Sequence, residues 1–465
     1  MLWSLSCTRK RECFLNKITV VDSPCGGGKT EWAISYMNAH PEMAFIFVTP
    51  FLDEVERIKA GTIKTFYEPQ KFQRTDLLGG SSSSKSKLKD FNDLLSNGWN
   101  VATTHKTFTN ATPETINILQ DNAYHLILDE TVDVLVPLND IIDSPQYRIN
   151  KKSLRLMLDN GIISVDANRR VHWTGGVQPL DGKEQHPFCE VQRHAENGTL
   201  ILIDEKLFAW EFSPEVFGAM ESVTILTYQM EGSFMHPYMQ LYGMDYDKFS
   251  TSGNYEAGFE LAPYVVNMEQ RKKWKGLITL YKDPKEAELG ALSATWYKDN
   301  VRGRQNMPEA TELRRALRRY FLSVGAEARN VMWTCPKDCR DIVAVKGFKL
   351  TRELTADEKK GRTQAQLNEY VDENGLRCWV ASTARATNKY KSRHILAYLL
   401  NFNPNPELSK YFGQNGAPLS RDAFALAGLI QWVWRSAIRD GEPITLWLPS
   451  PRMRRLFTEW LDSKR

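Results

Sequence analysis

The chain lacks the long apolar runs of membrane proteins and the cysteine pattern of secreted ones. It contains no run of about 18 apolar residues, the minimum for a membrane-spanning helix. Met1–Cys7 is too short for an export signal and is followed at once by the charged segment Arg9–Glu12. The seven cysteines are scattered and odd in number, which does not indicate a disulfide framework. We therefore expect a protein of the cytoplasm that has no membrane partner.

Internal repeats, a heptad register and a strong charge imbalance are also absent. The 465 residues are 42% hydrophobic and 25% charged, which is typical of globular proteins and favours about two or three domains. The formal net charge is +4, with an isoelectric point near 8.5. Such a mildly basic chain is compatible with a polyanionic partner but does not require one.

No metal-binding motif emerges from the histidines and cysteines. A group of four falls within one segment, but its spacing matches neither a zinc finger nor a zinc ribbon. Cys335 and Cys339 are spaced like half of a zinc site, yet no second pair completes four ligands. We interpret all of these residues as structural. The group of four comprises His172, His186, Cys189 and His194.

One stretch has the features of a phosphate-binding loop. An apolar strand pattern at Ile18–Val21 leads into a glycine-rich loop, in which Ser23 replaces the first consensus glycine, and a helical pattern follows at Glu31–Met37. Glycine N–H groups would surround phosphate oxygens, Lys29 would reach the β- and γ-phosphates, and Thr30 would bind Mg²⁺. The alternative is a flexible turn, which does not require Lys29 and Thr30. The expected ATP-binding residues are Ser23, Pro24, Cys25, Gly26, Gly27, Gly28, Lys29 and Thr30.

Two further apolar runs predict strands that end in polar residues. Ala44–Val48 leads into Thr49-Pro50 and then into a helical pattern, which repeats the order of strand, turn and helix. Asn100–His105 is another strand pattern with a polar end. Between them, Leu77–Lys89 is rich in glycine, serine and lysine and predicts a mobile, basic surface loop.

A fourth strand pattern, His125–Glu130, delivers two adjacent acids to its carboxyl end. A Mg²⁺-dependent triphosphatase requires acids placed in this way after a phosphate-binding loop. Asp129 would hold Mg²⁺ through water, and Glu130 would orient and deprotonate the attacking water. The alternative is that the two acids only cap a following helix.

The order and spacing of these segments resemble those of superfamily-2 helicases, and divergent phage or viral members more than DEAD-box proteins. The loop, the two strand ends and the acidic pair are similar to helicase motifs I, Ia, Ic and II, although no upstream glutamine motif is present. The carboxyl half adds segments that resemble motifs IV, V and VI. In chain order, the segments that carry the resemblance are 23–30, 48–50, 103–105, 129–132, 331–334, 384–388 and 431–439.

The resemblance implies an α/β fold with two tandem RecA-like P-loop domains, mostly parallel sheets, and ATP with Mg²⁺ in the cleft between them. We place the first domain at residues 14–250, with an inserted subdomain at about 147–210, and the second at 255–465. Gly253–Gly258 is the expected hinge between them. The resemblance also implies a sugar-phosphate track at strand ends, formed by Thr49, Pro50, Thr104, His105, Thr383, Arg385 and Thr387.

The segment similar to motif VI predicts a helix with one basic face. At about 100° per residue, Gln431, Arg435 and Arg439 advance by about 40° per step and share that face. Guanidinium groups there would stabilise charge on the γ-phosphate, so these three residues join Lys29 and Glu130 as candidate catalytic residues. The second arginine follows the first after four residues, whereas the family usually has three. The alternative is a basic face on a partly buried surface helix.

Other segments carry simpler patterns. Thr224–Tyr228 predicts a strand that would complete the first sheet, and we prefer it to Ser293–Thr295 as the counterpart of motif III. Arg377–Thr383 predicts a strand, and Thr199–Phe212 predicts a hairpin. Two arginine clusters are compatible either with phosphate contact or with a solvated helix face. They are Arg314, Arg315, Arg318 and Arg319, and Arg452, Arg454 and Arg455.

Together the patterns predict an ATP-dependent helicase or translocase that acts on nucleic acid, DNA in preference to RNA. A monomer is favoured, located in the host cytoplasm if a phage encodes it, with replication or recombination proteins as candidate partners. One alternative is a viral DNA-packaging motor ATPase, but the carboxyl half lacks the clustered acids of the nuclease domain in such motors. The other is a non-enzymatic nucleic-acid-binding scaffold, against which the intact Lys29, Thr30, Asp129 and Glu130 argue.

Overall fold

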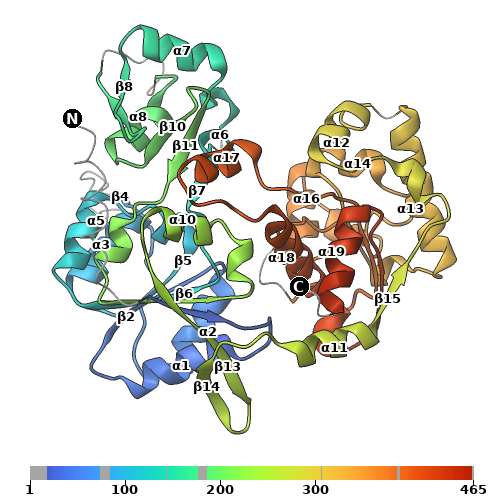
Figure 1. Ribbon diagram of the computed structural model, residues 1–465, viewed down its shortest axis with the longest axis horizontal. Helices are drawn as coiled ribbons and strands as arrows, with labels where there is room; N and C mark the ends of the chain where they lie inside the picture. The colour runs from blue at the N-terminus through green and yellow to red at the C-terminus, as the bar shows by residue number, and fades with distance from the viewer. Residues whose placement is uncertain are drawn as a thin grey trace. The chain divides into compact units, whose positions relative to one another are not determined.

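The computed structural model describes residues 18–73, 84–142, 144–175, 186–304, 306–384 and 388–462 (Figure 1). The chain divides into two compact units. The first contains the residues up to Ser23, Gly27–Tyr264 and Asn405–Leu419, and the second contains Pro24–Gly26, Val265–Pro404 and the residues from Ser420 onward. The loop expected at Leu77–Lys89 lies largely outside the described residues.

The first unit is built on a seven-stranded sheet in the order β14-β13-β1-β12-β6-β2-β5. All neighbouring strands are parallel except β13 and β14. Five strands arise from the apolar runs that predict strands in the sequence, so these predictions are confirmed. The strands are β1 Ile18–Asp22, β2 Ala44–Thr49, β5 Val101–Thr104, β6 Tyr124–Asp129, β12 Ser222–Thr227, β13 Tyr246–Asn254 and β14 Gly258–Pro263, and a separate short pair is β3 Phe72–Gln73 and β4 Ser84–Lys85.

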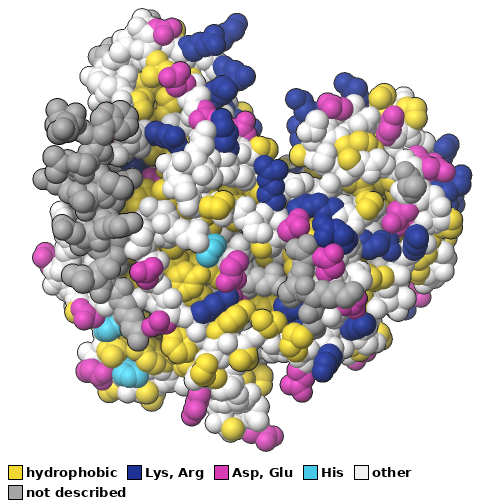
Figure 2. All heavy atoms as spheres, viewed as in Figure 1, with side chains coloured by type: hydrophobic (Ala, Val, Ile, Leu, Met, Phe, Trp, Pro, Cys, Tyr) yellow, Lys and Arg dark blue, Asp and Glu magenta, His cyan; other side chains and the backbone are white. Residues whose placement is uncertain are grey.

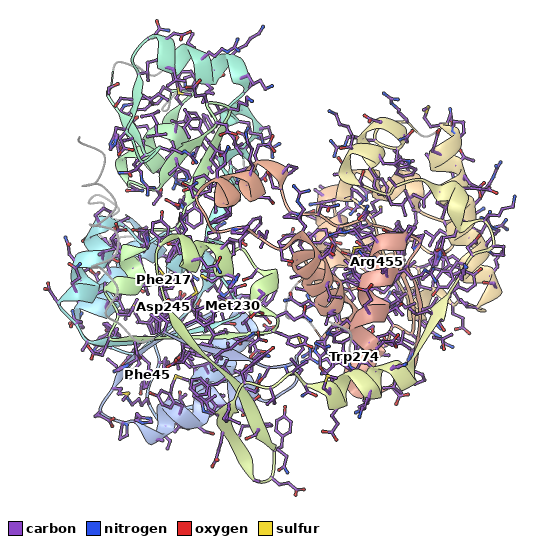
Figure 3. The ribbon with its side chains drawn as sticks, viewed as in Figure 1. Phe45, Phe217, Met230, Asp245, Trp274 and Arg455 are labelled. Carbon is purple, nitrogen blue, oxygen red and sulfur yellow. The ribbon has the colours of Figure 1, made fainter. Side chains whose placement is uncertain are left out.

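The strands of this sheet fill two cores, one on each face. Phe45 belongs to the core that α1 (Lys29–Ala39) and α2 (Leu52–Gly61) cover, whereas its neighbour Ile46 and Phe217 belong to the opposite core (Figure 3). Because both faces are buried, the parallel strands need apolar residues at nearly every position, which is why they are recognisable as continuous apolar runs. The opposite core is covered by α3 Lys87–Ser96, α4 His105–Phe108, α5 Pro113–Gln120, α9 Glu215–Gly218 and α10 Met235–Leu241.

Between β6 and β12 the chain forms an accessory subdomain, residues 135–211, with its own small core. Its three-stranded sheet has the order β10-β11-β7, and the predicted hairpin at Thr199–Phe212 is confirmed as the antiparallel pair β10 and β11. Lys and Arg side chains gather on its surface over α7 (Figure 2). Its elements are β7 Leu135–Pro137, α6 Leu138–Ile141, α7 Lys151–Asp159, β8 Ile163–Val165, β9 Val171–Trp173, α8 Cys189–Glu196, β10 Leu200–Ile203 and β11 Leu207–Glu211.

The prediction of a hinge at Gly253–Gly258 is wrong, because this segment is the turn of the antiparallel hairpin β13–β14. Asn254 closes the turn, since its Oδ1 accepts the N–H groups of Glu256 and Ala257 at 2.9 and 2.8 Å. Gly253 and Gly258 adopt φ values of 113° and 84°, which side chains disfavour. Glycines that suggest flexibility in the sequence therefore serve a tight turn.

The second unit contains a fully parallel four-stranded sheet in the order β15-β18-β17-β16. The strand predicted at Val331–Thr334 is confirmed as β16, and Ser293 caps a helix, α12, instead of ending a strand. The strands are β15 Ile278–Tyr281, β16 Val331–Thr334, β17 Ile395–Tyr398 and β18 Ile444–Trp447. The helices are α11 Met268–Leu277, α12 Ala294–Asn300, α13 Pro308–Ser323, α14 Arg340–Val343, α15 Ala356–Lys359, α16 Gln364–Glu373, α18 Arg421–Val433 and α19 Pro451–Leu461.

The prediction of a strand at Arg377–Thr383 is wrong. The segment makes only isolated bridges, one to Trp333 on β16 and one to Leu350. Its backbone changes partner within two residues, because the Cys378 carbonyl accepts from the Trp333 N–H while the Cys378 N–H donates to the Lys349 carbonyl. The segment therefore contributes a single bridge beside β16, and the strand that pairs with β16 in the sheet is β17.

One helix of the carboxyl half, α17 (Pro406–Gln414), belongs to the first unit. Leu408, Tyr411 and Phe412 on its buried face join the core that contains Phe217. Figure 1 shows the helix, in the red of the carboxyl half, beside green elements of the first unit, and α17 contacts α10. The assignment of this segment to the second domain is therefore wrong.

Both units are α/β with mostly parallel sheets, which confirms the predicted fold class. In the described part of the chain, every helix is too short or too polar to cross a membrane.

Candidate functional site

The glycine-rich loop joins the carboxyl end of β1 to the start of α1. Gly26 and Gly28 have φ values of 77° and 80°, a region that glycine enters without steric cost. Gly28 is the N-cap of α1, and no side chain caps this helix end. The first N–H groups of a helix have no partner within the helix and carry partial positive charge. The loop and the helix start are therefore suited to bind an anion.

Lys29, the first residue of α1, bends back over the loop. Its Nζ donates to the Ser23 carbonyl at 2.7 Å, and its side chain is buried. The Ser23 N–H donates to the Thr227 carbonyl at the end of β12. The Lys29 ammonium group is thus held beside the first residue of the loop. Thr30 is the next residue of the helix.

Asp129 and Glu130 lie at the carboxyl end of β6, in the same sheet as the loop. Asp129 is buried, and its burial, together with the neighbouring charges of Glu130 and Glu54, raises its pKa to about 7 against the opposing effect of Lys29. Glu130 has a φ of 70°, which is strained for this residue type, and its N–H donates to the Leu226 carbonyl at 2.8 Å. Strained backbone of this kind is concentrated at functional sites.

Polar residues from the neighbouring strand ends surround Asp129. The Thr49 hydroxyl donates to the Asp129 carboxylate at 3.5 Å, and the His105 Nε2–H donates to the Asp129 carbonyl at 3.0 Å. Thr49 and Thr104 face one another in the register of β2 and β5. The sheet therefore brings Lys29, Thr49, Thr104, His105, Asp129 and Glu130 to its carboxyl edge.

The acidic pair fits a divalent cation that is shared with a phosphate. A buried carboxyl with a raised pKa beside a second carboxylate is short of positive charge. In the described residues, no group of three or more His, Cys, Asp or Glu side chains could hold a metal alone. Mg²⁺ is typically held by one or two protein oxygens, water and substrate phosphates. Asp129 with Thr30 matches that donor set.

The three histidines weighed as zinc ligands contact other polar groups of the protein. His172 lies 3.3 Å from Asp166, and His186 contacts Gln192 and stacks on Trp173. The buried His194 contacts Thr199 at 3.2 Å. These contacts agree with a structural interpretation.

The prediction that Gln431, Arg435 and Arg439 share one helical face is wrong. Helix α18 ends at Val433, and Arg439 lies in a separate 3-10 turn, Ala437–Asp440. The Ser436 hydroxyl donates to the Val433 carbonyl at 2.7 Å, and side-chain bonds of this type compete with helix continuation. The Ala437 N–H then pairs with the Arg393 carbonyl.

The buried Arg435 donates through Nε to the Ala384 carbonyl at 2.9 Å. A role of Arg435 and Arg439 in charge stabilisation stays a prediction. Thr383 lies in an exposed turn, whereas Arg385 and Thr387 fall outside the described residues.

Most arginines of the two basic clusters hold the protein's own groups. Arg319 pairs with Asp283 and Glu312, and Arg452 pairs with Asp422. Arg454 donates to Glu286 and to the Tyr281 carbonyl. Arg318 is exposed on α13. Most of these arginines therefore bond to groups of the second unit, and phosphate contact stays a prediction.

Two residues that contact the glycine-rich loop are not predicted by the sequence. Thr251 on β13 bonds to Ser23 and Gly27, and the Phe259 ring on β14 lies against Gly28. Residues 246–251 show no strict alternation of polar and apolar residues, so the sequence gives no local signal for this strand or for its neighbour.

Fold and site together define an α/β protein with a candidate nucleotide site at the carboxyl edge of a mostly parallel sheet. Residues 272–461 match the family model described as the YonV C-terminal Rossmann-like domain. The chain is 28% identical to the SPbeta prophage-derived uncharacterized protein YonV of Bacillus subtilis (strain 168) over 465 residues, 97% of this chain and 100% of that protein.

The chain also aligns with solved structures. The structure named XPD_APO aligns with a TM-score of 0.46 and 14% identity, covering 98% of this chain and 96% of that one. The structure of S. tokodaii Xpd4 aligns with a TM-score of 0.45 and 13% identity, covering 96% and 94%. The DUF1998 helicase MrfA, bound to DNA and AMPPNP, aligns with a TM-score of 0.34 and 9% identity, covering 96% of this chain and 48% of that one.

Proposed function

We propose that this protein hydrolyses ATP and uses it to translocate on, or to unwind, nucleic acid. The observation that carries the proposal is the convergence of Lys29, Asp129 and Glu130 with the strand ends Thr49 and His105 at one edge of the first sheet. A lone glycine-rich turn would not require a lysine at the mouth and a buried acid at the end of a second strand.

The residues divide the chemistry of phosphoryl transfer between them. The N–H groups of the glycine-rich loop and Lys29 would bind the phosphates, and Asp129 with Thr30 would hold Mg²⁺, which supplies charge neutralisation on the phosphate oxygens. Glu130 is positioned beside Asp129 to accept a proton from the attacking water.

The nucleic-acid part of the proposal rests on the motif resemblance and on the polar strand ends. Thr49 ends β2, Thr104 ends the neighbouring parallel strand β5, and His105 begins α4, so a sugar-phosphate backbone would follow this edge of the sheet. Such contacts carry little sequence information, so we expect binding without strong sequence preference, with DNA favoured over RNA.

An ATPase assay with separate stimulants tests the proposal. Wild-type protein is incubated with Mg-ATP alone and with single-stranded DNA, duplex DNA, forked DNA or RNA. We expect nucleic acid to raise turnover, and Lys29→Ala to abolish it with every stimulant. If no nucleic acid changes the rate of ATP hydrolysis, the protein is an ATPase but the proposed translocation on nucleic acid is contradicted. If the protein does not bind ATP, the whole proposal is contradicted.

A further inference from the structure

A residue far along the chain, Thr251 on β13, is bonded to two points of the glycine-rich loop. Its backbone N–H donates to the Ser23 hydroxyl at 2.7 Å, and its own hydroxyl donates to the Gly27 carbonyl at 2.5 Å. Ser23 is the first residue of the loop and Gly27 lies near its end. One threonine therefore connects the beginning and the end of the loop to the same strand.

Thr251 lies where the backbone pairing of the two strands has stopped. The parallel register of β1 and β13 ends with Val21 opposite Phe249. Beyond this pair, the Ser250 hydroxyl donates to the Asp22 carbonyl at 3.4 Å, and the bonds of Thr251 follow. Side chains of β13 thus extend the contact from the strand into the loop.

The same geometry explains why serine stands at position 23, where the motif that the loop resembles has glycine. Three polar groups of Ser23 hold three different segments: its N–H binds Thr227, its carbonyl accepts from Lys29, and its hydroxyl accepts from Thr251. Glycine offers no hydroxyl and would lose the third of these bonds. The departure from the motif therefore ties the loop to β13.

The second strand of the hairpin also touches the loop. Phe259 faces Gly253 across the hairpin, and its ring lies so close to Gly28 that a Cβ atom there would come within 2.2 Å of the Phe259 Cε1 atom. Tyr255 at the turn packs edge-on against Phe259, with ring centroids 5.2 Å apart. Both strands of the hairpin thus contact the last residues before Lys29.

These contacts orient one peptide group of the loop. A trans peptide is planar, so its carbonyl and its N–H point in opposite directions. The Thr251 hydroxyl draws the Gly27 carbonyl toward the hairpin, and the Gly28 N–H consequently points away from it. In the proposed function this N–H belongs to the set that binds phosphate.

We propose that Thr251 is a positioning residue for the glycine-rich loop, and that the β13–β14 hairpin thereby sets the affinity of the loop for a nucleoside triphosphate. The inference rests on the proposed function, because it assigns a second element to the same site. It concerns binding, not the chemical step, since Thr251 bonds to the Ser23 hydroxyl and the Gly27 carbonyl of the loop.

The test compares Thr251→Val, which keeps the shape but removes the hydroxyl, with Thr251→Ser, which retains it. A fluorescent ATP analogue is titrated in the presence of Mg²⁺, and steady-state ATPase rates are measured. Thr251→Val should raise the Kd and the KM by about fivefold to tenfold, the effect of one neutral hydrogen bond, while kcat changes by less than about twofold. Thr251→Ser should recover most of the affinity. Ser252→Ala, at the exposed next residue of β13, is the matched control and should behave as wild type.

Ser23→Gly provides a second variant that leaves Thr251 intact. Ser23→Gly should also raise the Kd for the analogue. The double variant Ser23→Gly with Thr251→Val should raise the Kd by less than the product of the two single effects, because both substitutions remove the same contact. If wild-type protein and Thr251→Val bind the analogue equally well, the positioning role of Thr251 is overturned and the proposed function is not. Wild-type protein that binds no analogue would overturn the proposed function and this inference together.

Discussion

Asp22, the last residue of β1, forms an ion pair with Lys248 on β13, with 2.9 Å between the Oδ2 and Nζ atoms. Asp22 is buried and also accepts the N–H groups of Gln229 and Met230, so its carboxylate connects the end of β1 with β13 and with the segment that follows β12. Burial acts against the charge of Lys248, but Asp22 and Glu231 outweigh it and raise the pKa of Lys248 above its ordinary value. Lys248 therefore stays charged near neutral pH.

Replacing Lys248 with methionine should destabilise the protein strongly. The variant leaves the Asp22 carboxylate buried without its cation, and breaking a buried pair in this way costs about 3 kcal/mol or more. Urea unfolding followed by circular dichroism measures the difference. Glu56→Ala is the control, because it breaks the exposed pair of Glu56 with Lys59 and should change the free energy of unfolding by less than about 1 kcal/mol. Equal effects of the two substitutions would contradict the structural role of Asp22.

The accessory subdomain should lose stability in mild acid through His194. Burial, aided by the charge of Arg193, lowers the pKa of His194 from 6.5 to about 4. Between these values the unfolded chain binds a proton that the folded chain does not, so the stability is complete above about pH 6.5 and falls as the pH decreases toward 4. Thermal midpoints of wild type and His194→Gln from pH 7.5 to 4.5 test this. The variant should show the shallower pH dependence, and parallel curves would refute the expectation.

Glu130→Gln should separate binding from hydrolysis. Glutamine keeps the size of the side chain but cannot accept the proton of the attacking water, so turnover should fall by at least about 10²-fold while ATP still binds. Single-turnover hydrolysis and analogue titration measure the two quantities. Near-normal turnover would remove Glu130 from the site.

Cys25 should report occupancy of the loop. It is half-buried in the glycine-rich loop, whereas burial raises the pKa values of the Cys378 and Cys339 thiols to about 12, which makes them poor nucleophiles. A thiol reagent should inactivate the ATPase, and Mg-ATP should slow the inactivation. Cys25→Ala should resist the reagent. If ATP does not change the rate at which the reagent labels Cys25, the nucleotide binds at another site.

The central strands and the acidic end of β6 are predictable because local chemistry determines them. Runs such as Phe45–Val48 and Leu126–Leu128 are apolar at every position, as a strand buried on both faces requires. The loop carries a motif whose glycines and lysine have few other uses. These features depend on neighbours in the sequence.

The features that escaped prediction depend on residues far away in the chain. Nothing in the sequence of β13 indicates that Thr251 would meet Ser23. The end of α18 is equally hidden, because Ser436 and Arg393 stop a helix that the sequence pattern would continue. The sequence of α17 indicates a buried helix face, formed by Leu408, Tyr411 and Phe412, but it does not indicate which core that face joins.

The return of α17 to the first unit means that the protein cannot be dissected by a single cut. A fragment that begins at Val265 would carry α17 with its apolar face uncovered, and a fragment that ends at Tyr264 would expose the surface where Phe234 stacks on Phe412 and where Glu211 accepts from Tyr411. Recombinant halves should therefore aggregate or co-purify, whereas a first fragment fused through a short linker to residues 405–419 should be the smallest piece that folds by itself.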